Sequence, residues 1–286
     1  MNEYHDSFRA MNTDVDVFVY HHTSPTDAFL NIRLLFERQE ERFSRFRPSS
    51  LLSRLNAGAT VSDDVFARAC RLALDAFEFT GGLFNPLVLP ALRAAGYDRT
   101  FEEVSGGNPE AQAVPDPRES LAFDGASVSL RHGQLDLGGI VKGWTVDLAV
   151  EAIAAGYPNL FLNAGGDLRC EGSEPGMDGW FVSVAGRPGQ DAPWEGTMTG
   201  AVATSTTAKR RWSTTSGGVA HHLIDPRTGL PSDSPFEQVS AWADDARTAE
   251  CWAKAVVIGG EAAAAKAAAL GVELVTIDRD GVVQEF

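Results

Sequence analysis

An acid, two adjacent glycines and a lysine stand together at the predicted start of one helix. Apolar residues recur at helical spacing from Val141 to Ala155, which predicts a helix with Lys142 in its first turn. Asp136 and the Gly138–Gly139 pair then lie at the helix N-terminus, where unpaired N–H groups and the helix dipole favour an anion. The pattern is typical of a phosphate site. It also fits the alternative of a capped amphipathic helix with a solvated lysine.

His222 is the candidate for proton transfer. A neutral imidazole can accept a hydroxyl proton near neutral pH and donate it later. The segment from Asp225 to Gly229 reads DPRTG, a proline-led turn that would fix the position of His222. We expect His222 to be catalytic and His221 to pack or to form a hydrogen bond. The alternative is that His222 is structural as well.

Further motifs follow one another along nearly the whole chain. They are MNT at 11–13, FSRF from 43 with Asn56 after it, TGGLFNP at 80–86, LDLGGIVKGWTVD at 135–147, NAGGD at 163–167, ATS at 203–205, HHLIDPRTG at 221–229, and the helix after Thr248. In this order the motifs resemble the ApbE family, the FAD:protein FMN transferases. The resemblance predicts one ApbE-like flavin transferase domain over residues 1–286.

The resemblance implies a set of residues that contact FAD, and it places the catalytic base at His222. Apolar and aromatic side chains suit the flavin ring, although they also suit a core, and two hydroxyls could donate to phosphate. Arg210 or Arg211 would add positive charge, unless the pair forms a solvated turn, and we expect Asp167 to shape the site. The implied FAD contacts are Met11, Phe46, Leu83, Phe84, Asn85, Asp136, Lys142, Thr204, Ser205 and Ile224.

The chain departs from the family pattern at the implied magnesium site. The resemblance places metal ligands at Gly139 and at an acidic residue, here Glu250, with a threonine four residues later. Lys254 stands at that last position, and a charged lysine cannot bind a metal. Two interpretations of Mg²⁺ therefore stay open. Either Lys254 takes the place of the cation, or Glu250 and Lys254 are an ordinary helical pair.

The composition excludes several classes of function. The chain has 286 residues, of which 44% are hydrophobic, enough for a substantial core. Acidic residues outnumber basic ones by 39 to 24, so the net charge of −15 disfavours nucleic acid as a partner. Zinc, Walker A and Rossmann motifs do not occur. The cysteines are isolated and predicted to be buried thiols; they are Cys70, Cys170 and Cys251.

We expect a cytoplasmic protein, because the sequence has neither a signal peptide nor a run of about 18 apolar residues. The elements predict an α+β fold, a single compact domain with antiparallel-rich sheets and interspersed helices. Helices are predicted from Ser24–Pro25 to Phe43, at 62–80, 141–155, 248–258 and 261–269, and a surface loop at 105–120. Strands are predicted within 8–20, near Leu121, Val128 and Leu135, at 160–162, 180–184 and 201–203, and in a hairpin of 272–277 and 282–284.

The sequence thus predicts an enzyme that moves FMN from FAD to a threonine or serine hydroxyl of an acceptor protein and releases AMP. His222 would be the general base. Two alternatives remain. A pyrophosphatase would split FAD into FMN and AMP, and a non-catalytic protein would bind FAD without turnover.

Overall fold

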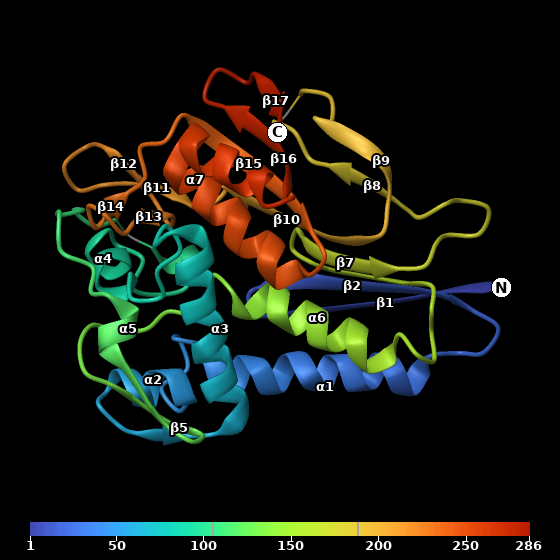
Figure 1. The fold of residues 1–286 in the computed structure, drawn as a ribbon, viewed down its shortest axis with the longest axis horizontal. Helices are drawn as coiled ribbons and strands as arrows, with labels where there is room; N and C mark the ends of the chain where they lie inside the picture. Colours follow the sequence, from blue (N-terminus) through green and yellow to red (C-terminus); the bar gives the residue numbers. More distant parts are fainter. Residues whose placement is uncertain (105, 188) are drawn as a thin grey trace.

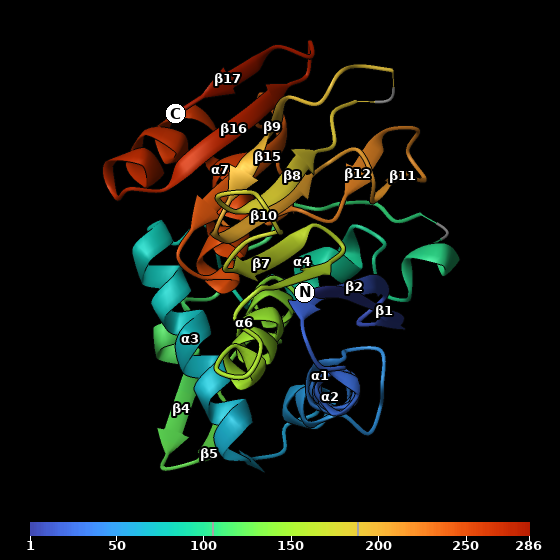
Figure 2. The ribbon, with the colours of Figure 1, turned by 90° about the vertical axis from the view of Figure 1, so that its right-hand side faces the viewer.

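A large antiparallel sheet organises the computed structural model, which describes residues 1–104, 106–187 and 189–286 (Figures 1 and 2). Among the described residues, this sheet has eight strands in the order β1-β2-β6-β7-β10-β15-β16-β17. These are β1 (Asn2–Ala10), β2 (Thr13–His21), β6 (Leu160–Ala164), β7 (Asp167–Glu171), β10 (Gly200–Thr206), β15 (Phe236–Ala243), β16 (Glu273–Asp278) and β17 (Val283–Glu285). The strands predicted at 160–162 and 201–203 and the final hairpin are confirmed.

The N-terminal stretch is a hairpin rather than a single strand. The predicted alternation within 8–20 spans the end of β1 and most of β2, with a turn at Met11 and Asn12. Both turn residues have positive φ, 49° and 59°. Val15, Val17 and Val19 are fully buried on one face, as their period of two predicts.

Helices cover one face of the sheet and a small hairpin covers the other. Residues Val15, Val17 and Val19 pack against α1 and α6, whereas Phe18 and Tyr20 point to the opposite face and pack near β8 and β9. In Figure 1, α6 lies between the sheet and α1, and α7 runs along the sheet in front of β15. The bounds are α1 (Thr26–Phe43), α6 (Val141–Ile153), α7 (Ala246–Ala269), β8 (Trp180–Val184) and β9 (Trp194–Met198).

The two helices predicted at 248–258 and 261–269 are the halves of α7. They meet at Gly260, whose φ of 63° and ψ of −151° are not helical. Glycine adopts this conformation without the steric cost that a Cβ would add. Helix α7 packs on β10 and β15, and it also contacts α6.

The remaining elements pack beside the helical layer. They are α2 (Leu51–Asn56), α3 (Asp64–Thr80), α4 (Leu89–Ala94), the 3₁₀ turn η1 (Phe101–Glu103), α5 (Pro117–Ser120), β3 (Val61–Ser62), β4 (Leu121–Asp124) and β5 (Ser127–Leu130). The prediction for 62–80 is confirmed by α3, but α2 and α4 were not predicted. The strand predicted near Leu135 is wrong, because this residue lies in a loop. Of the predicted loop at 105–120, Ser105 lies outside the described residues and the last four residues form α5.

Two small hairpins carry the histidine motif. They pair β11 (Arg211–Ser213) with β12 (Val219–His221), and β13 (Ile224–Asp225) with β14 (Leu230–Pro231). The fold class is α+β with antiparallel sheets, which confirms the prediction. Among the described residues, no helix has the length and apolar character needed to cross a membrane.

Candidate active site

The start of α6 lies so close to the start of α7 that the two backbones are in contact. A Cβ added to Gly143 would lie 2.6 Å from the carbonyl oxygen of Ala246, so only glycine fits here. The Gly143 N–H donates to Oε2 of Glu250 at 2.9 Å. This close approach places Glu250 and Lys254, one turn apart on α7, beside the first turn of α6.

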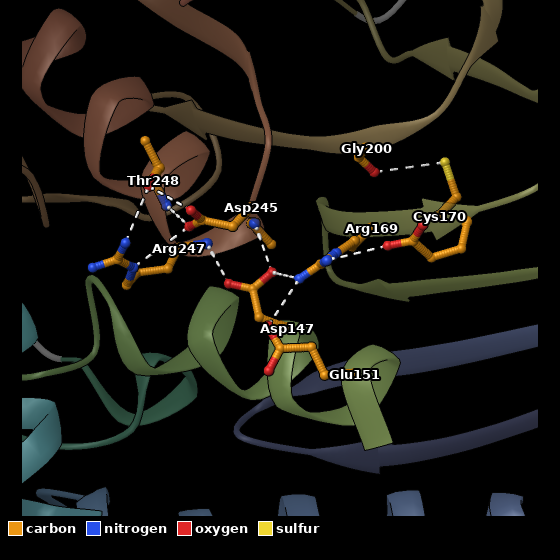
Figure 3. Close-up of polar contacts among 10 residues, drawn as sticks. Asp147, Glu151, Arg169, Cys170, Gly200, Asp245, Arg247 and Thr248 are labelled. Atoms are coloured by element: carbon orange, nitrogen blue, oxygen red, sulfur yellow. Dashed lines mark hydrogen bonds and ion pairs between the residues drawn. The ribbon is translucent and has the colours of Figure 1, made fainter. Parts of the chain in front are cut away.

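A buried carboxylate fixes the crossing of these helices (Figure 3). Asp147 of α6 accepts hydrogen bonds from the N–H groups of Ala246 (2.8 Å) and Arg247 (3.0 Å) at the start of α7. Asp245 caps the same helix end by accepting from the Thr248 N–H at 2.7 Å. Burial raises the pKa of Asp147 to about 6, so it is ionised at neutral pH, and Arg169 lies 3.2 Å away as its counterion.

Replacing Asp147 with asparagine should lower the free energy of unfolding by about 1–3 kcal/mol. An amide has one acceptor oxygen for the two N–H groups of α7, and it carries no charge for Arg169. Denaturant unfolding measures the change. Glu151→Gln is the matched control, because Glu151 is an exposed partner of Arg169 at 3.4 Å and should change stability by less than about 0.5 kcal/mol. Equal effects of the two variants would contradict a special role of Asp147.

Two lysines and two acids form a cluster beside the crossing. Lys142 pairs with Asp167 and donates to the Ala164 carbonyl at 2.9 Å, and Lys254 pairs with Oε1 of Glu250 at 2.9 Å. Burial raises the pKa of Asp167 to about 6, against the attraction of the Lys142 ammonium. Asp167 is therefore ionised at neutral pH. The prediction that Asp167 shapes this region agrees with its place at the end of the NAGGD turn between β6 and β7.

The lysines also decide the ionisation of Glu250. Burial alone would raise the pKa of Glu250, but Lys254, Lys142 and the Gly143 N–H outweigh burial and lower it. Likewise burial acts to lower the pKa of Lys254, and the charges of Glu250 and Asp167 raise it. Glu250 and Lys254 are thus kept charged mainly by each other, with Lys142 and Asp167 adding to the effect.

This donor set does not fit Mg²⁺, which prefers six oxygen ligands in octahedral geometry. Glu250 already uses one carboxylate oxygen for the Lys254 ammonium and the other for the Gly143 N–H. In the described part of the chain, no group of three or more histidine, cysteine or acidic side chains could hold a metal. Gly139, the other implied ligand, lies instead against the carbon stem of Lys254, since a Cβ added there would be 3.3 Å from Cδ and Cε.

The N-terminal N–H groups of α6 are partly used by the protein itself. Gly138 donates to Oδ1 of Asp136 at 2.7 Å, and Ile140 and Val141 both donate to the Leu137 carbonyl. With Gly143 bound to Glu250, the predicted phosphate cradle has fewer free donors than the helix start alone suggests. The side chains of the cluster must then supply more of the positive charge.

Asp136 has an arginine partner that the sequence did not reveal. Nε of Arg45 lies 3.2 Å from Oδ2 of Asp136, and the guanidinium stacks at 4.4 Å from the ring centroids of both Phe46 and Tyr97. Arg45 also lines a cavity of about 250 Å³. The residues that line it are Arg45, Ser53, Asn56, Ala57, Arg93 and Gln134. A second cavity, of about 260 Å³, is lined by other residues, among them Trp194 and Trp242. The only signal for Arg45 was its place within the FSRF motif.

His222 follows β12 and has a neutral imidazole. Burial lowers its pKa well below the usual 6.5, and the positive charges of Arg210 and Lys254 act in the same direction. Its Nδ1 is buried and has no hydrogen-bond partner among the described residues. His221, in contrast, contacts the Ser232 carbonyl through Nε2 at 3.0 Å and accepts from the Leu223 N–H, which fits the packing role predicted for it.

The predicted FAD contacts lie in several places. Phe84, Gly139 and Lys254 come together, and Phe46 joins Asp136 through Arg45. The Thr204 N–H donates to the carbonyl oxygen of Gly166, next to Asp167. The Thr204 hydroxyl contacts the Ser240 hydroxyl at 2.8 Å, so it already has a partner within the protein. Met11, in the β1–β2 turn, donates its N–H to Glu40 at 3.1 Å.

The other predicted contacts are Asn85, Ser205 and Ile224, which are buried, and Leu83, which is partly buried. The Asn85 amide donates to the Pro115 carbonyl at 3.1 Å and accepts from the Leu87 N–H at 2.9 Å, so both of its polar atoms are used. Ser205 is 7% exposed and Ile224 is 3% exposed in a cluster with Tyr97. Leu83 packs beside the apolar face of α7. For these residues the structure gives a packing role, and FAD contact stays a prediction.

Known proteins resemble this chain in sequence and fold. The sequence model of the ApbE family matches residues 11–276. The FAD:protein FMN transferase of Treponema pallidum is 28% identical over 251 residues, 79% of this chain and 69% of that protein. The Vibrio cholerae protein of the same name is 26% identical over 249 residues, 79% and 72% of the two chains.

Solved structures show the same fold. The ApbE protein of Thermotoga maritima superposes with a TM-score of 0.86 at 25% identity and covers 99% of this chain and 96% of its own. The apo flavinyl transferase ApbE of Pseudomonas stutzeri gives a TM-score of 0.85 at 19% identity, with 99% and 95% covered. Because the family model matches residues 11–276, nearly the whole length, this chain belongs to the ApbE family.

Proposed function

We propose that this chain is a FAD:protein FMN transferase that acts as one domain over residues 1–286. Flavin transfer is the activity named for the curated relatives, and the finer steps are inferred from the residues. FMN would pass from FAD to a threonine or serine hydroxyl of an acceptor protein, with release of AMP. The observation that carries the proposal is the neutral His222, whose buried Nδ1 lacks a partner in the described part of the protein.

The proposed reaction is a phosphoryl transfer. The acceptor hydroxyl oxygen forms a bond to the phosphorus of the FMN half, and the bond from that phosphorus to the bridging oxygen breaks. The electron pair of the broken bond leaves with AMP. His222 takes the hydroxyl proton as general base, which its low pKa keeps it free to do.

The charged residues around the cluster would hold the pyrophosphate. In such a transfer, negative charge develops on the phosphate oxygens and fixed positive groups stabilise it. Lys142 and the dipole of α6 would act from one side, and Lys254 from α7. Arg45, which pairs with Asp136, lines the cavity of about 250 Å³.

Incubation of the purified protein with FAD and a candidate acceptor protein tests the proposal. AMP, measured by chromatography, should appear together with covalent fluorescent flavin on the denatured acceptor and a mass increase equal to one FMN group. Free FMN in equal amount to AMP would instead indicate the pyrophosphatase. Saturable binding of FAD without AMP would indicate a non-catalytic binding protein, and preference for NAD⁺ over FAD would contradict the flavin site.

A further inference from the structure

The Lys254 ammonium has N–H donors that the described residues do not use. The Lys254 side chain is 19% exposed, whereas that of its partner Glu250 is 1% exposed, so Lys254 is the member of the pair that solvent can reach. An ammonium has three N–H donors. In the part of the chain that the structure describes, one goes to Oε1 of Glu250 and no second acceptor is bonded to Nζ.

The geometry holds that ammonium in one place. The Lys254 stem lies against Gly139 at the start of α6, where any Cβ would sit 3.3 Å from Cδ and Cε. Glu250 is itself anchored by the Gly143 N–H. The positive charge of Lys254 also acts to lower the pKa of His222.

The balance of charge at the cluster is unfavourable for a divalent metal. Lys142 and Lys254 carry two positive charges, and Asp167 and Glu250 carry two negative ones, so the cluster is neutral without any ion. A bound Mg²⁺ would add two positive charges next to two ammonium groups. A pyrophosphate would be attracted by the ammonium groups and repelled by the carboxylates, and the lysine side chains, 19% exposed against 3% and 1% for the acids, are the groups it can reach first.

We propose that the Lys254 ammonium is the resident cation of this site, that it contacts the pyrophosphate of FAD directly, and that the protein needs no divalent metal there. Glu250 is then a positioning residue, which orients Lys254 rather than binding a metal. This inference rests on the proposed function for the identity of the pyrophosphate. The part of the inference that concerns the divalent metal does not rest on the proposed function.

Metal binding is tested first, with Mn²⁺ as the probe and electron paramagnetic resonance of the free ion as the measurement. The wild-type protein should show no saturable Mn²⁺ binding at this site. The double variant Glu250→Asp, Lys254→Thr removes the ammonium and restores the ligand types that the family pattern implies, so it should bind about one Mn²⁺. Lys266→Thr, an exposed lysine on the same helix, is the matched control and should bind none.

FAD affinity in EDTA is tested second, by flavin fluorescence. Wild type and Lys266→Thr should bind FAD equally, and Lys254→Gln should bind at least about tenfold more weakly because a charge-assisted contact is lost. Circular dichroism checks that each variant is folded, and Lys254→Met provides a second neutral side chain if glutamine disturbs the fold. Unchanged FAD affinity in both neutral variants would overturn the proposal.

The third test is whether turnover of the wild-type protein depends on a metal. AMP release should be the same in EDTA and in Mg²⁺. Loss in EDTA with recovery in Mg²⁺, together with saturable Mn²⁺ binding, would overturn the resident cation while leaving the transferase intact. Failure of the wild type to bind FAD under any condition would instead refute the proposed function, and the Mn²⁺ result would still stand alone.

Discussion

His222→Asn is expected to reduce AMP release by a factor of about 10² to 10⁴ and to leave the affinity for FAD within a few fold. Asparagine has similar size and polar groups at the same branch point, but its amide cannot accept a proton at neutral pH. The base acts on the acceptor hydroxyl and not on the cofactor, so binding and turnover should separate. Stopped assays of AMP and titration of flavin fluorescence give the two numbers.

His221→Asn is the matched control for this variant. His221 contacts the Ser232 carbonyl and the Leu223 N–H, so its loss should affect the local hairpins and not the proton transfer. We expect a rate close to that of the wild type from the folded fraction. If His222→Asn loses FAD affinity and turnover in equal measure, the residue is structural.

The pH profile provides a second measurement of the same role. Only the neutral imidazole is a base, and burial lowers the pKa of His222 well below 6.5. The value of kcat/KM should therefore remain high as the pH falls below 6.5, where an ordinary histidine would already be protonated. Lys254→Gln removes one positive charge that depresses this pKa, so its acidic limb should move to higher pH. A wild-type limb above 6.5 would contradict the assignment.

Elements long enough to repeat an apolar pattern several times could be predicted from the sequence, and short elements could not. The spacing from Val141 onward predicted α6, and the apolar pattern on either side of Gly260 predicted both halves of α7. The six residues of α2 are too few to show a helical period. The alternation of Leu135 and Leu137 imitates a strand, but both polar groups of the Leu135 backbone bond to the Asn56 side chain, 79 residues away.

The same difference applies to the site. Glu250 and Lys254 are four residues apart on one helix, so the sequence alone predicted their pairing. The partner of Lys142 is Asp167 and the partner of Asp136 is Arg45, and neither pair follows from local spacing. Such contacts depend on how distant elements pack. The sequence therefore indicated candidate residues, but what most of them touch depends on the fold.

Gly143→Ala is expected to lower the free energy of unfolding by about 1–3 kcal/mol or more. The new Cβ would lie 2.6 Å from the Ala246 oxygen and 2.9 Å from the Arg247 nitrogen, and all three nearest atoms are backbone that cannot turn aside. The start of α7 must shift away from α6. Denaturant unfolding measures the loss of stability.

Gly156→Ala is the matched control, at the other end of the same helical segment. Its added Cβ would lie 3.7 Å from the Ile153 oxygen, an ordinary contact distance. This variant should be neutral or stabilised by up to about 1 kcal/mol, because alanine restricts the unfolded chain more than glycine does. Similar losses in the two variants would show that glycine at 143 is not required for the close approach of the helices.

Gly143→Ala should also impair turnover in the molecules that remain folded. The shift that relieves the clash moves the Gly143 N–H away from Oε2 of Glu250, which in turn holds the Lys254 ammonium. A displaced cation stabilises the transition state less, and a misplacement of this kind costs on the order of 10- to 100-fold in rate. AMP release, corrected for the folded fraction, should therefore fall in Gly143→Ala and not in Gly156→Ala. A destabilised Gly143→Ala protein with full activity per folded molecule would show that the helix crossing supports the fold alone, and that the position of Lys254 does not depend on it.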